Sequence, residues 1–130
     1  MSAGSGHYNS AFRPGLFEGR VAIVTGGGSG IGRCTAHELS HLGARIALVG
    51  RRQEKLDAVK AEIAAAGGEA EGFSCDIRDE ARVRETVAAI LARFGRIDHL
   101  VNNAGGQFFA PLESISANGW DAVVRNNLTG

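Results

Sequence analysis

Glycines between residues 26 and 32 are spaced so that the backbone around them could hold a phosphate group. They follow an apolar, partly β-branched run at 21–24 and precede a series of apolar positions at helical spacing: Ile31, Thr35, Leu39 and Leu42. Glycine accepts positive φ and has no Cβ to block a ligand, while the first amides of a helix attract an anion. Residues 20–32 therefore predict a buried strand, a turn for a nucleotide pyrophosphate and a helix packed through that apolar series. A glycine turn without ligand is the alternative. The assigned residues are Gly26, Gly28, Ser29, Gly30, Ile31 and Gly32.

Two adjacent arginines occupy a second position that could contact a nucleotide. A fold that binds NAD places Asp or Glu about 20 residues beyond the glycines, where the carboxylate holds the ribose hydroxyls. This chain has Gly50-Arg51-Arg52 there. A guanidinium can grip a 2′-phosphate through two hydrogen bonds, so Arg51, with Arg52 as the second candidate, predicts NADP. The alternative is that both arginines lie in solvent at the edge of the sheet with no ligand.

A third pattern suggests different chemistry. His37-Glu38-Leu39-Ser40-His41 matches the H-E-x-x-H helix of zinc proteases, and Glu62 is a candidate third ligand. Relative to the expected buried line of this helix, both histidines fall on the outer half and face solvent or a subunit, with no cleft around them. We therefore expect no metal site and treat a zinc hydrolase as the rival from another class.

The composition limits the class of protein. The chain has 130 residues, balanced formal charges and 44% hydrophobic residues, which is typical of one globular unit. Clustered cations are too few for a nucleic-acid partner, and no apolar run reaches the roughly 20 residues of a membrane-spanning helix. We expect a soluble, unsecreted protein in the cytoplasm, with Cys34 and Cys75 as free thiols.

The elements that must position these residues alternate along the chain. Residues 1–18 lack periodicity and predict a flexible arm. Further strands are expected at 45–49, 69–74 and 97–102, and helices at 53–66 and 79–94, ended by Gly67-Gly68 and Gly95. Ser116 is a plausible N-cap for a fourth helix. The expected sheet-facing side chains are Leu56, Val59 and Ile63 in the second helix and the amphipathic stripe Val83, Val87, Ile90, Leu91 and Phe94 in the third. The fourth helix carries Trp120, Val123, Val124 and Leu128.

This alternation predicts an α/β fold with a doubly wound parallel sheet of the Rossmann type. Short right-handed crossovers give the strand order 3-2-1-4, with a switch point between the first and fourth strands. Residues 26–32 and 102–106 meet at that point. Such folds have two halves, and residues 19–130 account for the first half and the start of the second, so we expect a domain that is incomplete at its C-terminus.

Three stretches resemble the classical short-chain dehydrogenase/reductase family: Thr25 to Gly32 (T-G-G-G-S-G-I-G), Asn102-Asn103-Ala104-Gly105, and Asn126 to Gly130. The resemblance covers residues 19–130. It implies that Asn103, Ala104 and Gly105 lie against the cofactor, that Asp76 hydrogen-bonds the adenine amino group, and that Ile77 packs on its ring. It also implies that Asn127 holds a proton-relay water as a member of the catalytic tetrad. On spacing alone, Asp76 could instead cap the third helix.

The same resemblance implies an NADP(H)-dependent oxidoreductase that transfers hydride to a carbonyl or enoyl substrate. Gly105-Gly106-Gln107-Phe108 and Gly119-Trp120 resemble the peroxisomal trans-2-enoyl-CoA and 2,4-dienoyl-CoA reductase branch, although Phe108, Phe109 and Pro111 could be ordinary packing. The alternatives are a 3-oxoacyl or ketone reductase and a nucleotide-binding protein without catalysis. The family's catalytic Ser and Tyr-x-x-x-Lys would follow residue 130, and Tyr8 has no Lys four residues later. The expected partners are a small substrate, such as an acyl-CoA, and further copies of the chain in a dimer or tetramer.

Overall fold

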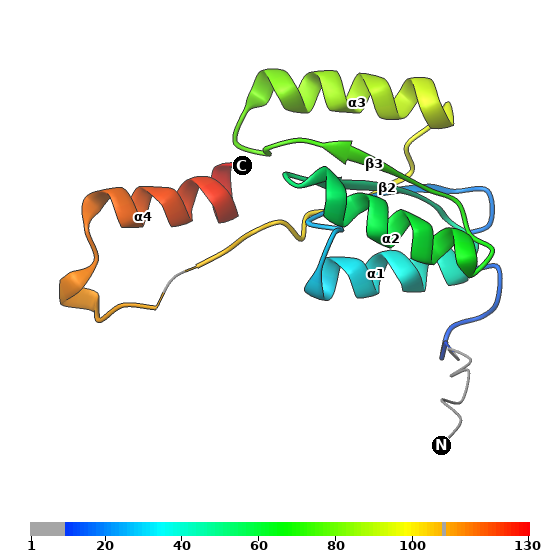
Figure 1. Ribbon diagram of the computed structural model, residues 1–130, viewed down its shortest axis with the longest axis horizontal. Coiled ribbons are helices and arrows are strands. Elements are labelled where there is room, and N and C mark those ends of the chain that lie inside the picture. The colour runs from blue at the N-terminus through cyan, green and yellow to red at the C-terminus, as the bar shows by residue number, and fades with distance from the viewer. Residues whose placement is uncertain (1–9, 108) are drawn as a thin grey trace.

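The computed structural model describes residues 10–107 and 109–130. Four parallel strands form one sheet in the order β3-β2-β1-β4, as predicted. Their bounds are β1 Val21–Thr25, β2 Arg45–Gly50, β3 Ala70–Ser74 and β4 His99–Val101. The central strands β1 and β2 are almost wholly buried, because helices cover both faces of the sheet, as Figure 1 shows. The predicted doubly wound α/β architecture is confirmed.

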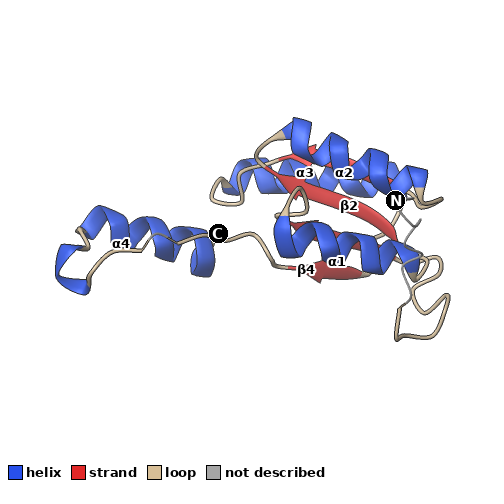
Figure 2. Cartoon of the chain, turned by 60° about the horizontal axis from the view of Figure 1, so that its bottom comes forward, coloured by secondary structure: helices blue, strands red, loops and turns tan. Residues whose placement is uncertain are grey.

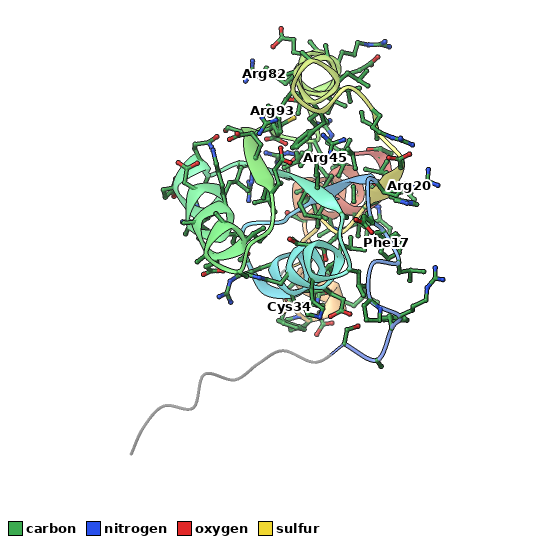
Figure 3. The ribbon with its side chains drawn as sticks, turned by 90° about the vertical axis from the view of Figure 1, so that its right-hand side faces the viewer. Phe17, Arg20, Cys34, Arg45, Arg82 and Arg93 are labelled. Carbon is green, nitrogen blue, oxygen red and sulfur yellow. The ribbon has the colours of Figure 1, made fainter. Side chains whose placement is uncertain are left out.

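Helices α1 (Gly30–His41) and α2 (Gln53–Ala65) cover one face, and α3 (Glu80–Phe94) covers the other. The first core includes Val24, Ile46 and Leu48 of the sheet and, as predicted, Leu56, Val59 and Ile63 of α2. The second core places Ile90 and Phe94 of α3 on the opposite face of the sheet. Arg45 of β2 and Arg93 of α3, labelled in Figure 3, lie 5.6 and 4.9 Å from the centre of the Phe94 ring. Their cationic groups extend the contact between α3 and the sheet.

The buried face of α1 differs from the predicted one at the start of the helix, whereas Leu39 packs against the core and Leu42 is buried as expected. Ile31 is 78% exposed, and Thr35 is only half-buried, whereas Gly32 and Ala36 are buried. A Cβ at Gly32 would lie 2.5 Å from the side-chain nitrogen of Asn103 and would overlap the carbonyl of Gly26. The helix begins so close to the glycine turn that only small residues fit on its inner side. Periodicity of large apolar residues could not reveal this face.

The apolar stripe of α3 is narrower than predicted. Ile90 and Phe94 are buried and Val83 packs against the core, but Val87 and Leu91 are exposed. Thr86 takes a buried position instead, because its hydroxyl donates to the carbonyl of Arg82 at 2.7 Å and so needs no other partner. Among the described residues, α3 contacts only the sheet beneath it, which leaves the two outer side chains without cover.

The ends of the elements follow the predicted local signals. Gly67 (φ +86°) follows α2, and Gly95 (φ +78°) ends α3 in the left-handed conformation. Asp79 caps α3 by accepting a hydrogen bond from the amide of Arg82 at 3.1 Å. Residues 14–18, within the predicted flexible arm, form turns, and the amide of Phe17 donates to the carbonyl of Leu42 at 2.9 Å. Residues 1–9 of that arm lie outside the described residues.

Beyond β4 the chain forms η1 (Leu112–Ser114), α4 (Ala117–Val124) and a π-helical segment η2 (Arg125–Thr129). Ser116 caps α4 as predicted, accepting from the amide of Gly119 at 3.1 Å. The apolar side chains expected on this helix differ in burial: Trp120 of α4 is 60% exposed and Leu128 of η2 is also exposed, whereas Val123 and Val124 are half-buried. Figures 1 and 2 show that α4 lies beside the sheet and covers neither face of the sheet.

Candidate cofactor-binding site

The turn between β1 and α1 presents unpaired backbone donors. Gly26 has φ +67°, which glycine tolerates, and its amide donates to the carbonyl of Val49 at 2.8 Å. The first hydrogen bond of α1 runs from the amide of Arg33 to the carbonyl of Ser29. The amides of Gly30 and Ile31 donate to none of the described residues, and the Ser29 hydroxyl makes no capping bond. This helix start therefore has donors available for an anion.

Thr25 holds the two loops of the switch point together. Its hydroxyl accepts hydrogen bonds from the amides of Asn103 (3.0 Å) and Ala104 (2.9 Å). The side-chain amide of Asn103 in turn donates to the carbonyl of Thr25 at 3.0 Å. Asn103 thus joins the end of β4 to the end of β1, which is the part expected of it. The role of Thr25 was not predicted, although a hydroxyl at the end of a buried strand was a signal for it.

A cavity of about 640 Å³ lies at the carboxyl ends of the strands, within the range of about 300–1,000 Å³ typical of small-molecule sites. Most of the predicted site residues line it. Four predicted residues, Gly30, Ile31, Gly32 and Asn127, are not among its lining residues, whereas Lys55 and Asn126 line it and were not predicted. The predicted residues that line it are Gly26, Gly28, Ser29, Arg51, Arg52, Asp76, Ile77, Asn103, Ala104 and Gly105.

The cations on the cavity wall differ in their partners. Arg52 lies 3.8 Å from the carboxylate of Glu54. The side chains of Arg51 and Lys55 form no ion pair or hydrogen bond within the described part of the chain. Because a cation left unpaired beside a cavity can take a ligand's negative charge without losing a protein partner, Arg51 and Lys55 are better placed for an anion than Arg52.

Asp76 lines the same cavity, and its carboxylate is already paired with a guanidinium. The charge of Arg51 also acts on this carboxylate, although the two form no ion pair. The Arg78 guanidinium donates to both carboxylate oxygens at 2.9 and 2.6 Å, and the Arg78 amide donates at 3.0 Å. The Arg78 side chain, followed by its amide, lowers the pKa of Asp76 to about 2. The alternative that Asp76 caps the third helix is wrong, because Asp79 is that cap. A carboxylate paired in this way can accept from a ligand without repelling a nearby phosphate.

Asn127 contacts the loop after β4 and does not reach the cavity wall. Its side-chain oxygen accepts from the amide of Gly106 at 3.0 Å, and its nitrogen donates to the carbonyls of Gly106 (2.7 Å) and Val123 (2.8 Å). These bonds place the π-helical segment η2 against residues 105–106. The neighbouring Asn126 lines the cavity instead.

The H-E-x-x-H helix serves a structural purpose in this fold. His37 is half-buried, not on the outer surface as predicted, and its Nε2 lies 2.8 Å from a carboxylate oxygen of Glu62 on α2. The guanidinium of Arg33 also donates twice to Glu62, at 2.8 and 2.9 Å. No group of three or more potential metal ligands occurs within the described residues. The carboxylate of Glu62 therefore joins α1 to α2.

Both cysteines are free, with Cys34 exposed (Figure 3) and Cys75 buried.

A parallel sheet with a glycine turn, unpaired helix-start amides and a cavity at its switch point defines a nucleotide-binding domain of the Rossmann type. The chain belongs to the short-chain dehydrogenase family, whose model matches residues 20–130. The members of this family are oxidoreductases that use a nicotinamide cofactor.

Individual relatives agree with this assignment. The peroxisomal 2,4-dienoyl-CoA reductase of Arabidopsis thaliana is 38% identical over 94% of this chain and 41% of its own length. A citronellol catabolism dehydrogenase of Pseudomonas aeruginosa is 57% identical, with a TM-score of 0.89 over 94% of this chain and 50% of that protein. The chain thus spans less than half the length of the curated relatives that it matches.

Solved relatives carry both forms of the cofactor. A metagenomic short-chain oxidoreductase in complex with NADP is 46% identical (TM-score 0.80; 87% of this chain and 52% of that one). An NAD⁺-bound xylitol dehydrogenase is 38% identical (TM-score 0.84; 88% of this chain and 44% of that one).

Among the described residues, no helix is both long enough and apolar enough to cross a membrane.

Proposed function

We propose that the protein is an NADP(H)-dependent oxidoreductase that transfers hydride between the cofactor and a carbonyl or enoyl substrate. The observation that carries the cofactor preference is the unpaired guanidinium of Arg51, which stands beside the cavity where a carboxylate would select NAD. The bound nicotinamide supplies the hydride. The chain's own residues bind and orient the cofactor.

The residues divide this task by position. The glycine turn and the first amides of α1, from Gly26 to Gly32, hold the pyrophosphate. Asp76 and Ile77 receive the adenine ring. Asn103, Ala104 and Gly105 present a small-residue surface to the cofactor on the side of β4. The lining of the cavity and the free donors at Gly30 and Ile31 support this arrangement.

For the substrate we propose an enoyl thioester, in particular a trans-2-enoyl-CoA. Sequence similarity to 2,4-dienoyl-CoA reductases supports this branch. Phe109, in the loop after β4, is 94% exposed, so it does not pack beneath that loop and is available to an apolar ligand. Phe108 lies outside the described residues.

A second candidate is a dehydrogenase acting in citronellol breakdown. The 57% identity to the Pseudomonas aeruginosa protein over nearly all of this chain favours it. The two candidates share the cofactor site and differ in the group that is reduced or oxidised.

A substrate panel with the full-length protein distinguishes them. NADPH oxidation is measured with trans-2-enoyl-CoA, 2,4-dienoyl-CoA, 3-oxoacyl-CoA and simple ketones, and NADP⁺ reduction with citronellol. We expect the enoyl thioester to give the largest kcat/KM. Activity confined to citronellol or to ketones would overturn the thioester proposal, and tight NADPH binding without turnover would favour a non-catalytic binding protein.

Asn127→Ala provides a matched variant for the same assay. In the proposed role Asn127 supports proton transfer, so we expect kcat to fall by at least about tenfold, the size of a lost proton-transfer contribution. Because Asn127 contacts Gly106 and not the cavity wall, NADPH affinity should change less than twofold. A loss of cofactor affinity equal to the loss of kcat would contradict this role.

A further inference from the structure

Lys55 is a cavity residue that sequence patterns did not single out. It is the third residue of α2 and is half-buried. Side chains on a helix lean toward its N-terminus, so Lys55 extends back toward Arg51 and Arg52, and all three line the same cavity. The helix that follows the two arginines thus contributes a third cationic residue, Lys55, to the lining of the cavity.

The stem of Lys55 is held against the glycine turn. A Cβ built on Gly28 would lie 3.1 Å from the Cβ of Lys55, which is tighter than most such contacts. The missing side chain of Gly28 leaves room for the stem between the turn and α2. This contact restricts the stem of a residue that lines the cavity, so less conformational freedom is lost when a ligand is bound.

The charge of Lys55 has no protein partner within the described residues. Lys60, five positions later on the same helix, donates to the carboxylate of Glu71 at 2.7 Å. Lys55 forms no such bond, and neither does the side chain of Arg51. Two cations without a protein partner, Arg51 after β2 and Lys55 in the first turn of α2, therefore line the cavity near the start of α2, where the dipole of the helix also favours an anion.

We propose that Lys55 is a further specificity-determining residue, whose ammonium group contacts the 2′-phosphate of NADP(H) from the side of α2 while Arg51 contacts it from the end of β2. This inference rests on the proposed use of NADP(H). In this proposal the 2′-phosphate has two ligands of different kinds: the planar guanidinium of Arg51 and the compact point charge of Lys55. Arg52, which lies near Glu54, contributes less.

Adenosine 2′,5′-bisphosphate and 5′-AMP test this proposal, because they differ only in the 2′-phosphate and lack the nicotinamide. Both are titrated by NMR or calorimetry into the full chain as wild type, Lys55→Ala, Lys55→Arg and Lys60→Ala. Lys55→Ala should weaken binding of the bisphosphate by about fivefold, equivalent to about 1 kcal/mol for a partly exposed charge pair. Its affinity for 5′-AMP should stay within twofold. Lys55→Arg should retain the affinity, and the control Lys60→Ala should not change it.

The two proposals fail in different ways. If wild type prefers the bisphosphate and Lys55→Ala keeps that preference, Lys55 does not contact the 2′-phosphate, although NADP use stands. If Lys55→Ala weakens both ligands equally, the residue acts on a shared part of the nucleotide and the proposal is overturned. If wild type binds both ligands equally, the NADP preference itself fails and this inference fails with it. Circular dichroism of each variant verifies that it is folded.

Discussion

Arg51 occupies the position at which members of this fold distinguish the two nicotinamide cofactors. It follows β2 directly, lines the cavity and has no ion-pair partner in the described part of the chain. Arg52, the next residue, lies within 3.8 Å of Glu54. Neighbours in sequence thus differ in how readily each can bind a phosphate.

Replacement of these residues should separate their contributions. A charge-assisted hydrogen bond contributes about 1.5–3 kcal/mol, so wild type should bind NADPH about ten- to a hundredfold more tightly than NADH. Arg51→Ala should remove most of this preference and Arg52→Ala less of it. Gly50→Asp should shift the preference toward NADH by repelling the phosphate. Fluorescence titration at low and high salt measures this, and the preference should shrink as salt screens the site. Equal loss in both arginine variants would contradict the assignment to Arg51.

Sequence position was enough to find Arg51, Asp76 and Asn103, because each stands within two residues of the end of a strand and lines the cavity. Lys55 could not be found in this way. It belongs to a helix, and only the direction of its side chain and the absence of a Cβ on Gly28 bring it to the cavity. Asn126 and Asn127 show the same limit, since a π-helical segment decides which of the two faces the cavity.

Among the elements, α1 shows most clearly where periodicity fails. Its inner side is formed by Gly32 and Ala36, because the helix starts against the carbonyl of Gly26 and the side chain of Asn103. A close approach between helix and turn selects small residues, whereas a search for large apolar residues selected Ile31. The strand order was predictable since short crossovers allow few alternatives.

One carboxylate reinforces the pairing of β4 with β1. Asp98 accepts a hydrogen bond from the amide of Val21 at 2.8 Å and pairs with the guanidinium groups of Arg96 and Arg20. Arg96 above all, and then the Val21 amide, hold the pKa of Asp98 well below its usual range. A carboxyl whose pKa is lower in the folded state contributes stability above its ordinary pKa of about 3.9 and loses that contribution as the pH falls toward the folded value.

Asp98→Asn should therefore lower the free energy of unfolding at pH 7 and reduce its dependence on pH below about 4, because an amide cannot gain a proton. Urea denaturation of wild type and variant at pH 7 and pH 3 measures both effects. Asp121→Asn is the matched control, because Asp121 is an exposed residue of α4 whose side chain makes no hydrogen bond within the described residues. If Asp98→Asn and the control lost stability equally between pH 7 and pH 3, Asp98 would not be the link between the strands.

The described residues leave several large apolar side chains on β4, α3 and α4 without cover. Leu100 on the edge strand β4 is 57% exposed, and Val87, Leu91 and Trp120 are also exposed. An edge strand with unpaired amides and carbonyls, flanked by exposed apolar side chains, favours association with other chains. The same surface supports the proposal that the protein is a dimer or tetramer.

The purified 130-residue chain should accordingly self-associate at micromolar concentrations. Sedimentation velocity over a range of concentrations measures its size distribution. Leu100→Lys should shift that distribution toward the monomer, because a charge on an edge strand opposes pairing. Phe109→Lys, at an exposed residue away from the strand edge, is the control. A monodisperse wild-type monomer that melts cooperatively would contradict this prediction.

Chemical-shift mapping tests the location of the cofactor site most directly. NADPH and NADH are titrated separately into the ¹⁵N-labelled chain, and the amide shifts are followed. Both cofactors should shift the amides of Gly26, Gly30, Asp76 and Ala104, and the difference between the two cofactors should be confined to residues 50–55. Cofactor-induced shifts centred on α4, or a difference between NADPH and NADH that is centred away from residues 50–55, would contradict the proposed binding of NADP(H) at this cavity.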